Sequence, residues 1–286
     1  MDPKLKMYRV LTMGKFITVF VLMTVSFGCV KENLNLCPNW GKYRVLFYDK
    51  TTDRYSAEYN VVIQDMAGSH RYFRTPDSAQ LKSDKVLKLF PGKYSFKALL
   101  SREPLDAVSR PVIKNGYQYM FADTSANIIK ASINPVVLDF KLANSLIVVR
   151  CHFDAGHTES HQIARMEISC PDDDSVTIDM HTGLSNYAQT VSSFYEECLY
   201  DYKQESFYYY CVPVISGNYL NFKVYVRDKN DMSIKILLSR IFLNTNVEQG
   251  KAYLFRFNVT PYKIEYMTTS VIDWNDYCHN TIITFY

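Results

Sequence analysis

LNFKVYVR, residues 220–227, alternates apolar and polar side chains without a break. Successive side chains of an extended strand point to opposite faces, so the apolar residues of this stretch would all share one face. They are Leu220, Phe222, Val224 and Val226. A strand with one apolar and one polar face is typical of an antiparallel sheet that is covered on a single side. The stretch therefore predicts a half-buried β-strand.

The same two-residue period recurs along most of the chain. It is clearest in residues 93–100, 138–142 and 253–259. Short apolar runs that also predict strands are Tyr43–Tyr48, Tyr59–Ile63, Leu146–Val149, Met166–Ser169, Phe207–Val212 and Ile234–Leu243. No long segment has the 3.6-residue period of a helix, and helical turns are expected only near residues 75–81 and 185–198. Many short strands joined by turns predict an all-β chain of antiparallel β-sandwich domains.

Two sandwiches in tandem are expected rather than one large barrel. Gly92–Phe96 and Gly250–Phe255 each place a glycine and a lysine before an aromatic strand, and an internal echo of this kind indicates a repeated domain. The 286 residues are enough for two domains of ordinary size. We place the first sandwich at residues 43–143 and the second at residues 144–286, with a short link near Ala143–Ser145 that favours close packing.

The N-terminus has the pattern of an export signal. Four basic residues precede a nearly uncharged apolar run at residues 16–27, which is too short to cross a bilayer as a helix. The run closes on Cys29, and a cysteine in this place is typical of a bacterial lipoprotein that is cut before it and acylated on it, for example with palmitate. Residues 1–28 are therefore predicted as a lipoprotein signal peptide and residues 29–42 as a lipidated tether. A plain signal peptide cut elsewhere, or an N-terminal membrane anchor, would also export the chain.

The charge of the exported part argues against a nucleic-acid partner. The whole chain has 32 basic and 29 acidic residues, and residues 1–28 hold four of the basic ones and one of the acidic ones. Subtraction leaves 28 of each sign, so the exported chain is neutral. A neutral chain without a basic cluster has no general attraction for a polyanion.

The cysteine count suits an exported protein in which disulfides form. Removing Cys29 from the seven cysteines leaves an even number. The remaining six are Cys37, Cys151, Cys170, Cys198, Cys211 and Cys278. The pairings with the shortest loops are Cys198 with Cys211 and Cys151 with Cys170, and the alternative is that several of the six are simply buried thiols.

No motif in the sequence assigns a catalytic role. There is no zinc-protease motif, nucleophile elbow or phosphate-binding glycine loop. His157 and His161 could bind a metal on a helix, but Gly156 and its polar neighbours favour a solvated loop. The acidic run Asp172–Asp174 lacks the spaced ligands of a calcium loop. We therefore expect no enzyme activity, no metal site and no cofactor.

Aromatic residues crowd the stretch Phe194–Tyr210. Tyrosine rings stack on sugars and line interfaces, but tyrosine also favours half-buried strands, which explains the stretch more simply.

The chain ends inside a strand pattern, with no polar tail. Its last residues are Thr281, Ile282, Ile283, Thr284, Phe285 and Tyr286. A terminal strand must pair with something. It closes its own domain by default, and the alternative is that it is donated to a groove of another subunit.

The stretch CVKENLNLCP, from Cys29 to Pro38, resembles the mature start of the FimB-type fimbrial anchor lipoproteins of Bacteroidales, which belong to the fimbrillin superfamily. The resemblance continues in Pro91–Tyr94, in Leu138–Val149 and in Ile272–Trp274. It implies two transthyretin-like sandwiches, a lipid anchor in the outer membrane, and a place at the base of a fimbrium. The pair Lys31-Glu32 resembles a short signal for the outer face of that membrane.

These observations predict a non-enzymatic, surface-exposed lipoprotein of the cell outer membrane. It would act as an anchor or minor subunit of fimbriae, and it would join fimbrial structural subunits by exchange of strands, with Thr281–Tyr286 as the candidate assembly strand. The alternative is a surface glycan-binding or adhesin lipoprotein. An exported hydrolase comes third.

Overall fold

The computed structural model describes residues 41–50, 54–55, 59–75, 86–101, 109–189, 193–199, 206–274 and 276. These residues are almost entirely strands and turns, with one 3₁₀ turn at Ala155–His157. None of the described segments is a helix of the length and apolar character needed to cross a bilayer. Residues Tyr43–Tyr286 form one compact unit, and the following concerns that unit alone.

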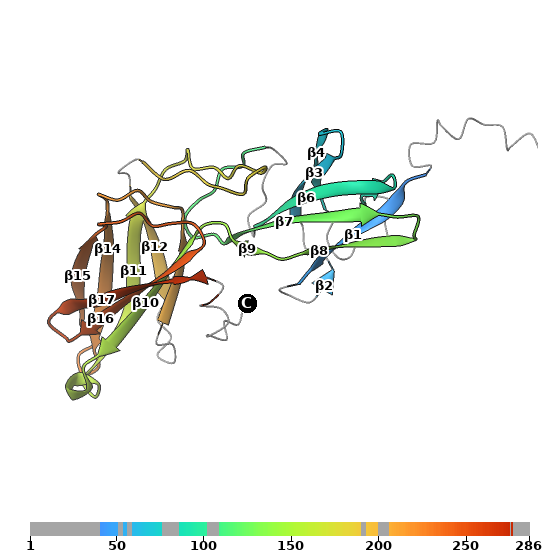
Figure 1. The fold of residues 1–286 in the computed structure, drawn as a ribbon. Coiled ribbons are helices and arrows are strands. Elements are labelled where there is room, and N and C mark those ends of the chain that lie inside the picture. Colours follow the sequence, from blue (N-terminus) through green and yellow to red (C-terminus); the bar gives the residue numbers. More distant parts are fainter. Residues whose placement is uncertain are drawn as a thin grey trace, which may run out of the picture. The chain divides into compact units, whose positions relative to one another are not determined.

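The first two sheets draw all their strands from residues 43–142 (Figure 1). One sheet contains β1 (Tyr43–Asp49), β2 (Arg54–Tyr55), β5 (Lys88–Leu89) and β8 (Ile133–Leu138). The other has the order β4 (His70–Arg74), β3 (Tyr59–Asp65), β6 (Gly92–Ser101), β7 (Tyr119–Ile128) and β9 (Lys141–Leu142). Phe47 of one sheet meets Phe96 of the other edge to face, with ring centroids 5.6 Å apart, so the two sheets share a core.

The other two sheets draw their strands from residues 145–273. One has the order β13 (Ser206–Cys211), β10 (Ser145–Phe153), β16 (Lys251–Val259) and β17 (Ile264–Asp273). The other has the order β12 (Ser193–Leu199), β11 (His161–Pro171), β14 (Tyr219–Asp228) and β15 (Ile234–Phe242). The chain is thus all-β, with two sandwiches in tandem. Their independence as domains divided at residues 143 and 144 stays a prediction.

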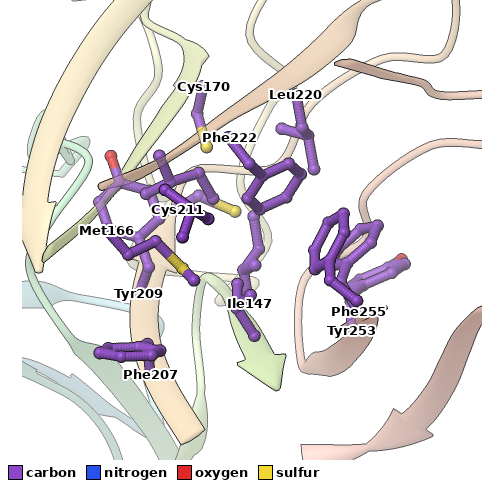
Figure 2. Close-up of a cluster of buried hydrophobic side chains, with 14 of the residues drawn as sticks. Ile147, Met166, Cys170, Phe207, Tyr209, Cys211, Leu220, Phe222, Tyr253 and Phe255 are labelled. Atoms are coloured by element: carbon purple, nitrogen blue, oxygen red, sulfur yellow. The ribbon is translucent and has the colours of Figure 1, made fainter. Parts of the chain in front are cut away.

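The apolar residues of the alternating stretch 220–227 are buried in β14, as predicted. Leu220, Phe222, Val224 and Val226 are all at most 1% exposed. The ring of Phe222 lies 5.5 Å from that of Phe255 and 5.0 Å from that of Phe257, centroid to centroid. Figure 2 shows Phe222 and Phe255 within this cluster of buried side chains.

Strand β10 is buried on both faces, as its apolar run predicts. Leu146 and Val148 belong to the core that also contains Phe47 and Phe96. Ile147 and Val149, on the opposite face, belong to the core of the second sandwich. One strand therefore contributes to two cores.

The pairing differs from the prediction in two respects. β1 pairs with β8, and β10 with β16, in parallel, so the sheets are not purely antiparallel. The similar stretches Gly92–Phe96 and Gly250–Phe255 do not occupy equivalent positions in the two sandwiches. The first begins β6, which lies between β3 and β7, whereas the second begins β16, which lies beside β10.

Two smaller expectations are also corrected. Residues 193–199 form strand β12, which pairs with β11, so the helical turn expected near 185–198 is wrong there. Cys151 and Cys211 are free thiols, so neither predicted short-loop disulfide is formed. Burial raises the pKa of the Cys151 thiol to about 12, which keeps it protonated and unreactive.

Candidate assembly surface

Both site predictions made from the sequence, Cys29 and Thr281–Tyr286, lie outside the described residues. The last described strand, β17, ends at Asp273. Both therefore stay predictions.

Strand β15 is an edge of its sheet. In the described structure it pairs with β14 on one side, and no strand lies on the other. Edge strands present a row of unpaired N–H and C=O groups and are normally protected by charged side chains. Edge strand β4 follows this rule, because it carries His70, Arg71 and Arg74.

β15 carries the charged residues Lys235 and Arg240, but most of its outward side chains are apolar. Ile234, Ile236, Leu238 and Phe242 are 52%, 53%, 69% and 47% exposed. Leu237 between them is buried, as expected when side chains alternate between faces. Four of the five outward side chains of β15 are therefore apolar, the fifth being Arg240, and we call these four the β15 row.

β17, an edge strand of the other sheet, also exposes apolar residues. β17 approaches β15 and exposes Tyr266, Met267 and Val271. The Nζ of Lys235 lies 4.9 Å from the centre of the Tyr262 ring and links the two hairpins. Nine of the twenty exposed large hydrophobic residues in the described structure lie on β15, on β17 or in the turns before them. Large exposed apolar patches mark interaction sites.

The turn before β15 displays an apolar side chain at a cost. Met232 has φ 62°, the one positive φ of a non-glycine among the described residues, and is 60% exposed. That conformation costs about 1–2 kcal/mol. Asp231 holds the turn by accepting a 2.8 Å hydrogen bond from the backbone of Ser233. Hydrogen bonds from Ser233 lower the pKa of the Asp231 carboxyl.

Neighbouring strands frame the β15 row with ordered polar and aromatic groups. The guanidinium of Arg240 stacks 3.8 Å from the centre of the Tyr219 ring, and the Tyr219 ring lies 5.0 Å from that of Phe242. Tyr225 donates a 2.9 Å hydrogen bond to Glu167, which also pairs with Arg165. An apolar centre with a polar frame is the usual anatomy of a protein interface.

The aromatic stretch near Tyr210 belongs mainly to the core. Phe207 and Tyr209 are 5% and 3% exposed, and only Tyr208 faces outward, at 40%. The side chains of residues 194–205 lie outside the described part. The described half therefore supports the explanation by half-buried strands.

The histidines and aspartates singled out in the sequence have structural roles. The described residues contain no group of three or more His, Cys, Asp or Glu side chains that could hold a metal. His157 and His161 lie 6.2 Å apart between ring centroids, and His161 faces Asp228 at 3.5 Å. Asp173 caps its own turn by accepting from the backbone of Ser175 at 2.9 Å.

The sequence contained one signal for the β15 row. The run Ile234–Leu243 has apolar residues at both its odd and its even positions. Such a run is read as a strand buried on both faces, and nothing local says that one face is left uncovered.

No family model matches the chain, and no curated protein matches it. Solved structures do share its fold. A crystal structure from Bacteroides uniformis, described as a "putative cell adhesion protein", is 12% identical, has a TM-score of 0.56, and is matched over 83% of this chain and 99% of that one. Structures with the same description from Bacteroides fragilis (12% identity, TM-score 0.52, 81% and 96% covered) and Bacteroides ovatus (13%, 0.51, 82% and 98%) are also similar. These likenesses show the fold.

Proposed function

We propose that this chain is a non-enzymatic, lipid-anchored outer-membrane protein of the FimB type, acting as an anchor or minor subunit of fimbriae. The observation that carries the proposal is the β15 row on an unpaired sheet edge. The likeness of fold to structures described as cell adhesion proteins supports it. So does the resemblance of residues 29–38 to the mature start of fimbrial anchors.

The geometry of β15 suits the addition of a strand. An incoming strand would pair with the free backbone groups of β15 at a spacing of about 4.8 Å. Its outward side chains would then lie beside Ile236 and Leu238 and remove them from water, which is worth about 25 cal/mol per Å² of apolar surface. The partner proposed is a fimbrial structural subunit that supplies an apolar strand.

The reciprocal strand is proposed to be Thr281–Tyr286 of this chain. Its apolar pattern suits donation to a neighbouring subunit, and closure of its own domain is the competing role. The two edges would give the chain one accepting and one donating surface.

Ile236→Arg is expected to reduce incorporation into the fimbrial polymer at least about tenfold, because an unpaired charge opposes burial in an apolar interface. The measurement is the amount of this chain in the high-molecular-weight fraction sheared from producing cells. Ile129→Arg is the matched control, since Ile129 is 56% exposed against 53% for Ile236 and lies in the turn between β7 and β8.

Normal incorporation of Ile236→Arg would remove the β15 row from the proposal.

Deletion of residues 281–286 tests the proposed donor strand. If the strand is donated, the shortened protein folds but is not incorporated; if it unfolds, the strand closes its own domain.

Cys29→Ala is expected to release the protein from the membrane fraction. The substitution removes the acylation site, while the signal peptide still exports the chain. Acyl chains add about 0.8 kcal/mol of membrane affinity per buried CH₂ group. The measurement is fractionation together with the mass of the mature N-terminus. Retention in the membrane of Cys29→Ala from which residues 1–28 have been removed, or an unmodified Cys29 in the wild type, would refute the anchor.

A second candidate function is glycan binding at the cell surface. It is favoured by a cavity bordered by Phe121, Trp274 and three aspartates.

A further inference from the structure

A cavity of about 620 Å³ opens where β7 and β9 meet the ends of β16 and β17. Its volume lies within the range of about 300–1,000 Å³ that is usual for small-molecule sites. The residues that line it are Phe121, Asp123, Asp139, Lys141, Leu142, Thr182, Gly183, Leu184, Gln249, Gly250, Asp273 and Trp274. They come from five separate stretches of the sequence.

One wall of the cavity is a rigid turn. Asp179 accepts hydrogen bonds from the backbone of His181 at 2.8 Å and of Thr182 at 3.3 Å, and the bond from His181 is the main cause of the lowered pKa of its carboxyl. Gln249 donates to the carbonyl of Gly183 at 2.6 Å and accepts from the backbone of Ser185 at 3.0 Å. The wall is therefore formed before any ligand arrives.

Each of the three aspartates that line the cavity is paired with a lysine, and Lys141 adds one more positive charge to the lining. Lys97 pairs with Asp123 at 2.6 Å, Lys251 with Asp273 at 2.7 Å, and Lys50 with Asp139 at 3.7 Å. The side chains of the three aspartates are 52%, 60% and 69% exposed, so their oxygens stay accessible. Paired charges of this kind do not favour a ligand with a strong net charge of either sign. They do offer acceptors and donors side by side.

The remaining lining is apolar. Phe121, Leu142, Leu184 and Trp274 provide hydrocarbon and ring surface. Trp274 is only 4% exposed, and its indole N–H is buried without a hydrogen-bond partner. Such an unmatched donor is rare in folded proteins.

We propose that this cavity binds a neutral carbohydrate of one to a few sugar units. Each sugar hydroxyl both donates and accepts, which matches carboxylates and ammonium groups set side by side. The C–H faces of a sugar ring match Phe121 and Leu184, as in other aromatic-lined sites. The inference deepens the glycan-binding candidate and does not depend on fimbrial assembly.

Leu184→Arg fills the mouth of the cavity with a long charged side chain and is expected to weaken glycan binding at least about tenfold, which corresponds to 1.4 kcal/mol. Leu238→Arg is the matched control, because Leu238 is 69% exposed against 65% for Leu184 and belongs to the β15 row. The probes are arrays of neutral hexose and N-acetylhexosamine oligosaccharides, with sialylated and uronic-acid glycans and a lysine-rich peptide for comparison. Hits are quantified by titration calorimetry on the full exported chain.

The expected result is binding of a neutral glycan by the wild type and by Leu238→Arg, and loss of it in Leu184→Arg. Three results would overturn the proposal: no neutral glycan bound, unchanged binding by Leu184→Arg, or binding confined to the charged probes. Leu238→Arg separates the two functions, since it should lose assembly and keep the glycan. Failure of one proposal thus leaves the other standing.

Discussion

Phe222→Ala is expected to lower the free energy of unfolding by about 3–5 kcal/mol, the usual cost of removing a phenyl ring from a packed core. Phe222 is 0% exposed. Its ring contacts those of Phe255 and Phe257 on the opposite sheet, so its loss leaves a cavity between the two layers. The midpoint and slope of urea unfolding measure the effect.

Tyr219→Ala is the control on the same strand. Tyr219 is 40% exposed and contacts Arg240 and Phe242 on the surface. Its loss should cost about 1–2.5 kcal/mol, the sum of one exposed cation–π contact and one aromatic contact. Equal costs for the two substitutions would contradict the placement of the core.

Gly183→Ala is expected to cost about 2–5 kcal/mol, from two causes that add. Gly183 has φ 72°, where a side chain costs about 1–2 kcal/mol. A Cβ there would also lie 2.9 Å from Cζ of Phe121 and closer still to two other ring atoms, and overpacking of this kind costs about 1–3 kcal/mol. Thermal or urea unfolding would measure the loss.

Gly217→Ala measures the first cause, the backbone conformation, without the second. Gly217 has φ 88°, but an added Cβ there would meet nothing within 4 Å. It should therefore lose only the backbone part, about 1–2 kcal/mol. If both variants lose the same amount, the Phe121 ring yields freely and does not press on the turn.

The strands were predictable where their residues alternate or form apolar runs. β6, β10 and β14 lie where the patterns in residues 93–100, 146–149 and 220–227 place them, because burial of one face or both is a local consequence of side-chain direction. Pairing was less predictable. The parallel contacts of β1 with β8 and of β10 with β16 join segments far apart in the sequence, and no local pattern records them.

The candidate sites were less accessible to sequence reasoning than the fold. The β15 row was visible as an apolar run, but the run does not say which face stays uncovered. The cavity was not visible at all, because Phe121, Asp139, Gly183 and Trp274 meet only in the folded chain. The failed echo between β6 and β16 shows the same limit, since both stretches have the residues of a strand and only topology separates their places.

Strand β10 also has a mechanical consequence. It starts at Ser145, directly after the first sandwich, and is hydrogen-bonded along its length to β13 and β16. Tension that arrives through Ser145 is therefore borne in shear by many bonds at once, and no slack loop lies between the two halves to stretch first. A protein that tethers a filament to a cell under flow would benefit from such a stiff joint.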